Sequence, residues 1–198
     1  MENSKQSFLL GLFGGIAVIA VIAVIILAVA LIGGKNDSGN VAGVTNTNIN
    51  NPNQPGNTNI GSANVTGVVT YSERKDAEIC TQDGKPVVYL FSTTWCPHCS
   101  WIKDTFDNTA QKYIDSGDII AYHWEVDTYD NTLTSEIETV VPPDHLAIYQ
   151  DFNPNGSIPT FVFGCKYFRV GNGFEQTNDL SAEAAEFEAL IQEMIRSI

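Results

Sequence analysis

The chain reads Trp95-Cys96-Pro97-His98-Cys99 at the point where a strand pattern gives way to a helix pattern. Residues 87–91, just before it, are apolar and β-favouring and have the length of a buried strand. After it, apolar side chains recur at spacings of three and four until Gly117, which stands at the expected helix C-cap. The five residues therefore span a strand-to-helix junction, with both cysteines at the start of the helix.

The position of the two cysteines predicts redox chemistry. Two residues three apart in a helix lie about 5 to 6 Å from each other, within the range that a disulfide bridges. Cys96 at the helix N-terminus faces unpaired N–H groups that favour a thiolate, and the imidazole of His98 adds positive potential. Pro97 suits the first turn because its missing N–H would have no intrahelical partner. We expect Cys96 to be the nucleophile and Cys99, one turn deeper, to be the resolving thiol.

Further elements follow this first strand and helix. Residues 119–126, 160–164 and 166–170 are predicted strands, and the last two are so close that they should form a hairpin near Gly164-Cys165. At the C-terminus, apolar residues share one helix face, with acidic residues early and Arg196 late. The predicted order is strand, helix, strand, hairpin and helix, which is an α/β arrangement.

With this order in place, the chain resembles the thioredoxin superfamily, and its Pro-His dipeptide resembles that of the DsbA-type disulfide oxidases. A second mark is Ile158-Pro159-Thr160, at the position of the superfamily's cis-proline loop. The resemblance covers about residues 71–198 and implies a thioredoxin-like fold, a central mixed sheet flanked by helices. It also implies that Pro159 packs against the active-site disulfide and that the backbone of Ile158 pairs with a substrate chain. Trp95 flanks the site, and both substrate contact and packing are open for it.

The sequence departs from the family pattern in two places. Family members usually carry a buried Asp or Glu six residues before the first active-site cysteine, and this chain has Leu90 there. Glu125, near the end of the neighbouring strand, is the substitute that we consider as proton acceptor for Cys99. DsbA proper also inserts a helical domain before the cis-proline, whereas residues 127–158 are too few for an independent core. We expect one short helix there, starting near Pro142-Pro143-Asp144.

The same topology brings the remaining two cysteines together. Strand 160–164 runs away from the active-site end, so Cys165 lies at the opposite pole, where Cys80 precedes the first strand. We predict a structural Cys80–Cys165 disulfide, with free thiols or a second redox pair as alternatives. A zinc site that joins these cysteines to Cys96 and Cys99 is less favoured, because structural Cys₄ sites usually show two close pairs. We therefore expect neither a metal nor a cofactor.

The N-terminal third has a different organisation. Residues 1–7 form a short tail, and residues 8–32 are uncharged and apolar; as a helix they would be about 37 Å long, enough to span a bilayer. A cleaved signal peptide ending near Ala28-Val29-Ala30 is the alternative, although its apolar segment is usually shorter. Residues 33–66, rich in Asn, Gly and Thr, are predicted to be a disordered tether. The folded domain is predicted at 67–198.

Charge and context complete the functional expectation. The formal net charge of −13 argues against nucleic-acid binding. His123 and His145 are isolated in the sequence, as satisfied or surface histidines usually are. A structural disulfide indicates an oxidising compartment, which agrees with a single-pass cell-membrane anchor and an extracytoplasmic catalytic domain. We expect a protein disulfide oxidoreductase that oxidises cysteine-containing exported proteins and is regenerated by a membrane redox partner. Alternatives are a thioredoxin-like reductase or isomerase and a non-catalytic peptide-binding or chaperone module.

Overall fold

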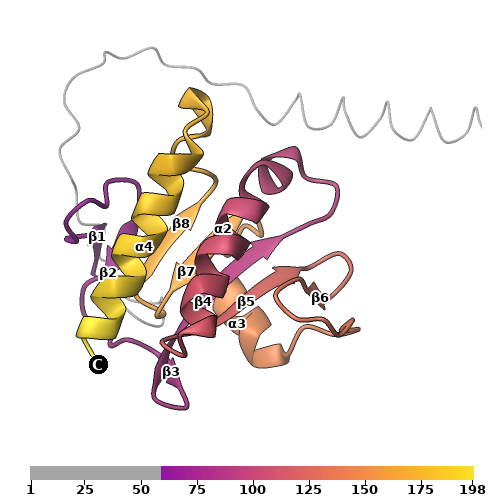
Figure 1. Ribbon diagram of the computed structural model, residues 1–198, viewed down its shortest axis with the longest axis horizontal. Helices are drawn as coiled ribbons and strands as arrows, with labels where there is room; N and C mark the ends of the chain where they lie inside the picture. Colours follow the sequence, from indigo (N-terminus) through magenta and orange to yellow (C-terminus); the bar gives the residue numbers. More distant parts are fainter. Residues whose placement is uncertain (1–58) are drawn as a thin grey trace, which may run out of the picture. The chain divides into compact units, whose positions relative to one another are not determined.

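The computed structural model describes residues 59–198, in which strands from distant parts of the chain form one mixed sheet (Figure 1). The predicted tail at 1–7, the anchor at 8–32 and most of the tether lie outside the described residues. Within residues 59–198, no helix combines the length and the apolar character needed to cross a membrane.

The sheet is mixed because its central strand has a parallel and an antiparallel neighbour. Its order is β1-β2-β8-β7-β4-β5-β6, with β3 paired to β4 beside this path. β4 runs parallel to β5 and antiparallel to β7. The elements follow along the chain as β1 (Ile60–Ser62), β2 (Ser72–Arg74), β3 (Thr81–Gln82), β4 (Lys85–Ser92), α2 (Pro97–Asp115), β5 (Ile120–Glu125), β6 (Asp130–Asn131), α3 (Pro143–Phe152), β7 (Thr160–Phe163), β8 (Tyr167–Val170), the 3₁₀ helix η1 (Glu175–Thr177) and α4 (Leu180–Arg196).

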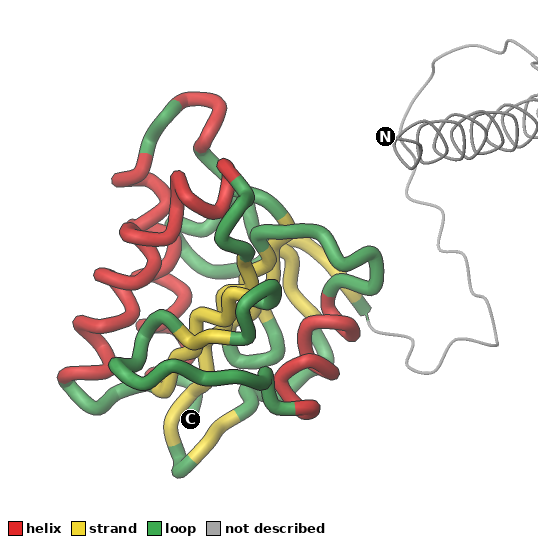
Figure 2. Tube along the Cα trace, turned by 90° about the vertical axis from the view of Figure 1, so that its right-hand side faces the viewer, coloured by secondary structure: helices red, strands yellow, loops and turns green. Residues whose placement is uncertain are grey.

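β4 is buried on both faces of the sheet, which explains its unbroken apolar run. Val88 and Leu90 belong to the core that includes residues of α2 and α4. Val87, Tyr89 and Phe91 belong to the other core, which includes residues of α3. Figure 2 shows the two long helices on one side of the strands and the short α3 on the other.

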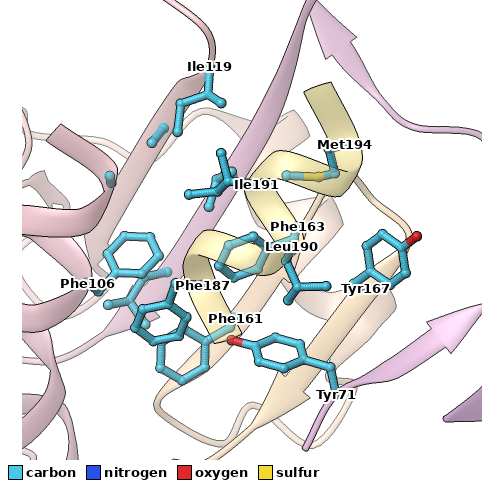
Figure 3. Packing of buried hydrophobic residues seen from close by; sticks show 14 of the residues in the cluster. Tyr71, Phe106, Ile119, Phe161, Phe163, Tyr167, Phe187, Leu190, Ile191 and Met194 are labelled. Atoms are coloured by element: carbon cyan, nitrogen blue, oxygen red, sulfur yellow. The ribbon is translucent and has the colours of Figure 1, made fainter. Parts of the chain in front are cut away.

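The larger core fixes α2 against the sheet (Figure 3). The ring of Phe187 in α4 lies 5.7 Å from that of Phe106 in α2 and 5.4 Å from that of Phe161 in β7, measured between centroids. These edge-on and tilted arrangements are favourable for aromatic pairs. Since α2 starts at the cysteine pair, this packing also sets the position of the redox site.

The folded domain begins by Ile60, so the predicted tether at 33–66 extends too far. β1 pairs with β2, with Ile60 opposite Arg74. Val65 and Val68 are buried in the larger core. Each of these valines stands in a mostly polar segment without a helix or strand period, so only their packing in the folded core reveals their role.

The hairpin and the short helix predicted in the C-terminal half are present. β7 and β8 pair antiparallel and turn through residues 164–166. Gly164 has a φ of 59°, and a Cβ there would lie 2.6 Å from the sulfur of Met194, so both conformation and space require glycine. The segment before the hairpin carries α3, which starts at Pro143, and does not form a helical domain.

Candidate active site

α2 begins directly after the first cysteine of the pair. Cys96 is the N-cap, with φ −82° and ψ 119°, and Pro97 is the first helical residue. The amide of Cys99 donates a hydrogen bond to Cys96 Sγ at 3.3 Å. The thiol of Cys96 therefore occupies the place where a capping oxygen usually sits, at the end of the helix that favours negative charge. Both cysteines are free, so the structure represents the dithiol state.

Protonation distinguishes the two thiols better than exposure does, because Cys96 is 4% exposed and Cys99 is 2% exposed. Burial raises the pKa of the Cys99 thiol to about 12. Burial is the largest cause of this shift; the hydrogen bond with Cys96 and the negative charges of Cys96 and Asp127 contribute to it, whereas the hydrogen bond with the backbone of Thr93 opposes it. Cys99 therefore keeps its proton at neutral pH, and Cys96 is the better placed nucleophile.

We expect iodoacetamide to modify Cys96 well before Cys99 in the reduced protein at pH 8. With a pKa of about 12, about one Cys99 thiol in ten thousand is ionised at that pH, and only the thiolate reacts. Tandem mass spectrometry of a time course locates the label. A Cys96→Ser variant serves as the control, because Cys99 should still react slowly when burial is the main cause. Labelling of Cys99 first would contradict this assignment.

The proline loop has the predicted isomer. The Ile158–Pro159 peptide bond is cis, and Pro159 is buried at the start of β7. The carbonyl of Pro159 accepts a hydrogen bond from the amide of Gly171 at 2.8 Å. Neither backbone polar group of the half-buried Ile158 is hydrogen-bonded to another residue within 59–198. Thr160, which follows Pro159, already pairs with Phe91 and Val170 in the sheet.

Leu90 is fully buried in the larger core, so the family's acidic position is apolar here. The carboxyl group of Glu125, our candidate proton acceptor, has no hydrogen-bond partner among residues 59–198 and does not contribute to the pKa of Cys99. Asp127 does contribute to it. Its carboxylate accepts hydrogen bonds from the amide and the hydroxyl of Thr94, and although desolvation opposes them, these bonds lower the pKa of Asp127. Sequence reasoning missed Asp127, although its place just after the strand 119–126 was a usable signal.

His123 lies in the core, beside the buried Leu90 across the parallel β4–β5 pair. Its Nε2 is 2.7 Å from Ser92 Oγ, and its Nδ1 is 2.6 Å from an oxygen of Asp107. This arrangement has the residue types of a hydrolytic triad, but Ser92 is only 1% exposed and a substrate cannot reach it. His145 is also buried and accepts a hydrogen bond from the indole of Trp124. Both histidines are satisfied core residues.

His98 is exposed and is held by the loop between β8 and α4. Its Nδ1 lies 2.8 and 2.9 Å from the two carboxylate oxygens of Glu175. Trp101, on the next turn of α2, donates its indole N–H to Asn178 of the same loop at 2.9 Å. Trp95 has no such partner within 59–198 and is 72% exposed. Sequence reasoning missed Glu175, because 77 positions separate it from His98 and no local pattern links them.

A disulfide joins Cys80 to Cys165, the pair for which the topology favoured a bridge. Cys80 immediately precedes β3, which lies at the opposite end of the domain from the start of α2 (Figure 1). The eight residues of β4, which separate the two ends, span roughly 26 Å. The four cysteines are therefore too far apart to form the alternative zinc site.

Comparisons with known proteins agree with this architecture. The family model for a thioredoxin-like domain matches residues 74–188, which is more than half of the chain and includes the cysteine pair, the cis-proline and about half of α4. No curated protein and no solved structure matches the chain. The mixed sheet flanked by helices and the Cys-x-x-Cys pair at a helix start agree with this sequence match. The chain therefore belongs to the family of thioredoxin-like domains.

Proposed function

We propose that this chain is a membrane-anchored, extracytoplasmic thiol–disulfide oxidoreductase that oxidises exported proteins. Membership of the thioredoxin-like family and the two neighbouring cysteines support thiol–disulfide exchange in general. The observation that carries the proposal is the unequal pair at the start of α2. Cys96 Sγ accepts a hydrogen bond from the amide of Cys99 at a helix N-terminus, while the pKa of the Cys99 thiol is raised to about 12.

The reaction transfers two electrons from a substrate dithiol to the Cys96–Cys99 disulfide. A substrate thiolate attacks Cys96 Sγ, the bond to Cys99 breaks, and the Cys99 sulfur leaves and takes a proton. The second substrate thiolate then attacks the substrate sulfur of this mixed disulfide, which forms the substrate disulfide and releases the Cys96 thiolate. The high pKa of Cys99 favours capture of the proton once the bond has broken. A membrane redox partner reoxidises the dithiol in this scheme.

We infer that substrate chains bind at the proline loop, which the superfamily resemblance places next to the cysteine pair. The unpaired backbone groups of Ile158 can accept and donate hydrogen bonds to an extended peptide, as β-strand addition requires. The resemblance to the superfamily assigns this role to the residue before the cis-proline. Trp95, exposed just before Cys96, adds an apolar surface for the side chains of such a peptide.

Two features of the chain support its proposed location, the apolar N-terminal segment and the disulfide of the folded domain. The apolar residues 8–32 are long enough for a single-pass anchor, and the Cys80–Cys165 bridge is a type of bond that seldom persists in cytosol. Together they favour a cell-membrane protein whose redox domain faces the oxidising side. Partners would then be exported proteins with cysteines.

A reductase or isomerase is the second candidate, and one observation favours it. Positive potential from His98 would stabilise the thiolate of the reduced form and so favour an oxidase, but the carboxylate of Glu175 lies 2.8 Å from that imidazole. A paired imidazole stabilises the Cys96 thiolate less than an unpaired imidazolium does, and a less stabilised thiolate means a weaker oxidant.

The central test uses a Cys99→Ala variant of the full-length chain and a peptide that contains one disulfide. The Cys96 thiolate should open the peptide disulfide and form a mixed disulfide, which Cys99 can no longer resolve and which N-ethylmaleimide preserves by alkylating the peptide thiol that the reaction frees. A non-reducing gel then shows a shifted band that dithiothreitol removes. A Cys96→Ala/Cys99→Ala variant is the matched control and should give no such band. Absence of the adduct with Cys99→Ala, or failure of the oxidised wild type to oxidise the reduced peptide, would refute the proposal.

A further inference from the structure

The loop between β8 and α4, residues 171–179, closes over the first turn of α2. The carboxylate of Glu175 contacts the imidazole of His98 through both oxygens, at 2.8 and 2.9 Å. The side-chain amide of Asn172 donates to the backbone carbonyl of His98 at 2.9 Å and also contacts Glu175. Asn178 accepts the indole N–H of Trp101. Three residues of one loop therefore engage the first two turns of α2.

This loop has a fixed position because it is tied to the buried part of the domain. The amide of Phe174 donates to a carboxylate oxygen of Glu183 at 2.8 Å, and Glu183 is fully buried in α4. On the other side, the amide of Gly171 donates to the carbonyl of the cis-proline, Pro159. Glu175 is thus held at His98 by backbone contacts on both flanks.

The contact places a negative charge directly against the group that was expected to stabilise the Cys96 thiolate. Glu175 stays ionised at neutral pH, because hydrogen bonds from Asn172 and His98 outweigh the effect of partial burial and lower its pKa. An ion pair presents a much smaller potential to a neighbouring sulfur than an unpaired imidazolium does. Glu175 therefore reduces the preference of Cys96 for the thiolate state.

We propose that Glu175 is a positioning residue that sets the reduction potential of the Cys96–Cys99 pair by neutralising His98. This inference rests on the proposed thiol–disulfide activity and adds its regulation by a residue outside the Cys-x-x-Cys segment. Without the carboxylate, no negative charge offsets the effect of the His98 imidazolium on the Cys96 thiolate. The reduced form then gains stability, and the pair becomes a stronger oxidant.

The test measures the equilibrium of the full-length chain with glutathione at about pH 6, where an unpaired imidazole is largely protonated. In this equilibrium the protein dithiol gives two electrons and two protons to oxidised glutathione, yielding the protein disulfide and two reduced glutathiones. Glu175→Gln should shift the equilibrium constant about tenfold toward the dithiol, which corresponds to about 30 mV. In a His98→Gln background, the same substitution should have no effect.

Glu188→Gln is the charge-matched control. Glu188 also pairs with a cation of α2, Lys112, at 2.8 Å, but at the far end of that helix. Its removal should leave the potential unchanged. The inference is wrong if Glu175→Gln moves the equilibrium less than twofold, or if its effect persists without His98. The peptide oxidation assay run on the same samples separates the two proposals. If the potential shifts in a protein that cannot oxidise the peptide, the proposed oxidase function is refuted, while the proposed effect of Glu175 on the reduction potential stands.

Discussion

Replacing Arg169 with methionine is expected to lower the free energy of unfolding by about 3 to 5 kcal/mol, as loss of one partner of a buried ion pair does. The guanidinium is only 5% exposed and contacts Glu183 and Glu186, whose carboxylates are almost completely buried. It also lies over the rings of Tyr71 and Phe161, at 4.6 and 4.8 Å. Methionine keeps much of the apolar stem but leaves two carboxylates in the core without a counterion.

The carboxylates hold distant parts of the chain together, which is why they remain buried. Glu186 accepts hydrogen bonds from the amides of Val69 and Thr70, ahead of β2, and Glu183 accepts the amide of Phe174 in the β8–α4 loop. Loss of Arg169 therefore weakens the attachment of the N-terminal strands and of the loop that carries Glu175.

Urea unfolding of Arg169→Met measures this effect through the transition midpoint and slope. Arg196→Met is the matched control, because Arg196 forms an exposed ion pair with Glu193 on the same helix, α4. Surface pairs contribute about 0 to 1 kcal/mol, so the control should unfold close to wild type. Equal midpoints for the two variants would show that the buried network adds little.

Loss of the Cys80–Cys165 bridge is expected to lower the free energy of unfolding by about 4 to 5 kcal/mol. The bridge closes 85 residues of the chain, and in the loop-entropy description a longer loop removes more freedom from the unfolded state. That loop contains β4, α2, β5, α3 and β7, so the bridge constrains most of the unfolded domain.

This prediction is tested by unfolding a Cys80→Ala/Cys165→Ala variant in urea. The variant is compared with a protein that keeps the Cys80–Cys165 bridge. Both of these proteins also carry Cys96→Ala/Cys99→Ala, so that the active-site pair cannot change its redox state during the measurement. A strong reductant should bring the bridged protein to the midpoint of the variant without the bridge. Coincident curves before reduction would mean that the bridge adds no stability. The active-site residues lie at the other end of β4 and should keep their arrangement when the bridge is removed.

The redox pair and its supporting fold could be derived from the amino-acid pattern to a large extent. The junction before Cys96, the helix up to Gly117 and the hairpin at Gly164 follow from apolar spacing, helix caps and turn residues, which act between neighbours in the chain. Family resemblance added the cis-proline and the fold. The predicted acceptor Glu125 was chosen by position alone, and the carboxylate that acts on the pKa of Cys99 is that of Asp127, two residues later.

Contacts between remote residues could be read only from the packed molecule. Glu175 meets His98 across 77 positions, and Glu186 meets Val69 across 117. The strand at Ile60 pairs only because β2 offers it an edge, and β2 itself depends on β8. Local preferences leave such pairings undetermined, because neighbours in the chain do not reveal the partner of a polar or an isolated apolar side chain. Only folding brings that partner within hydrogen-bond or van der Waals distance.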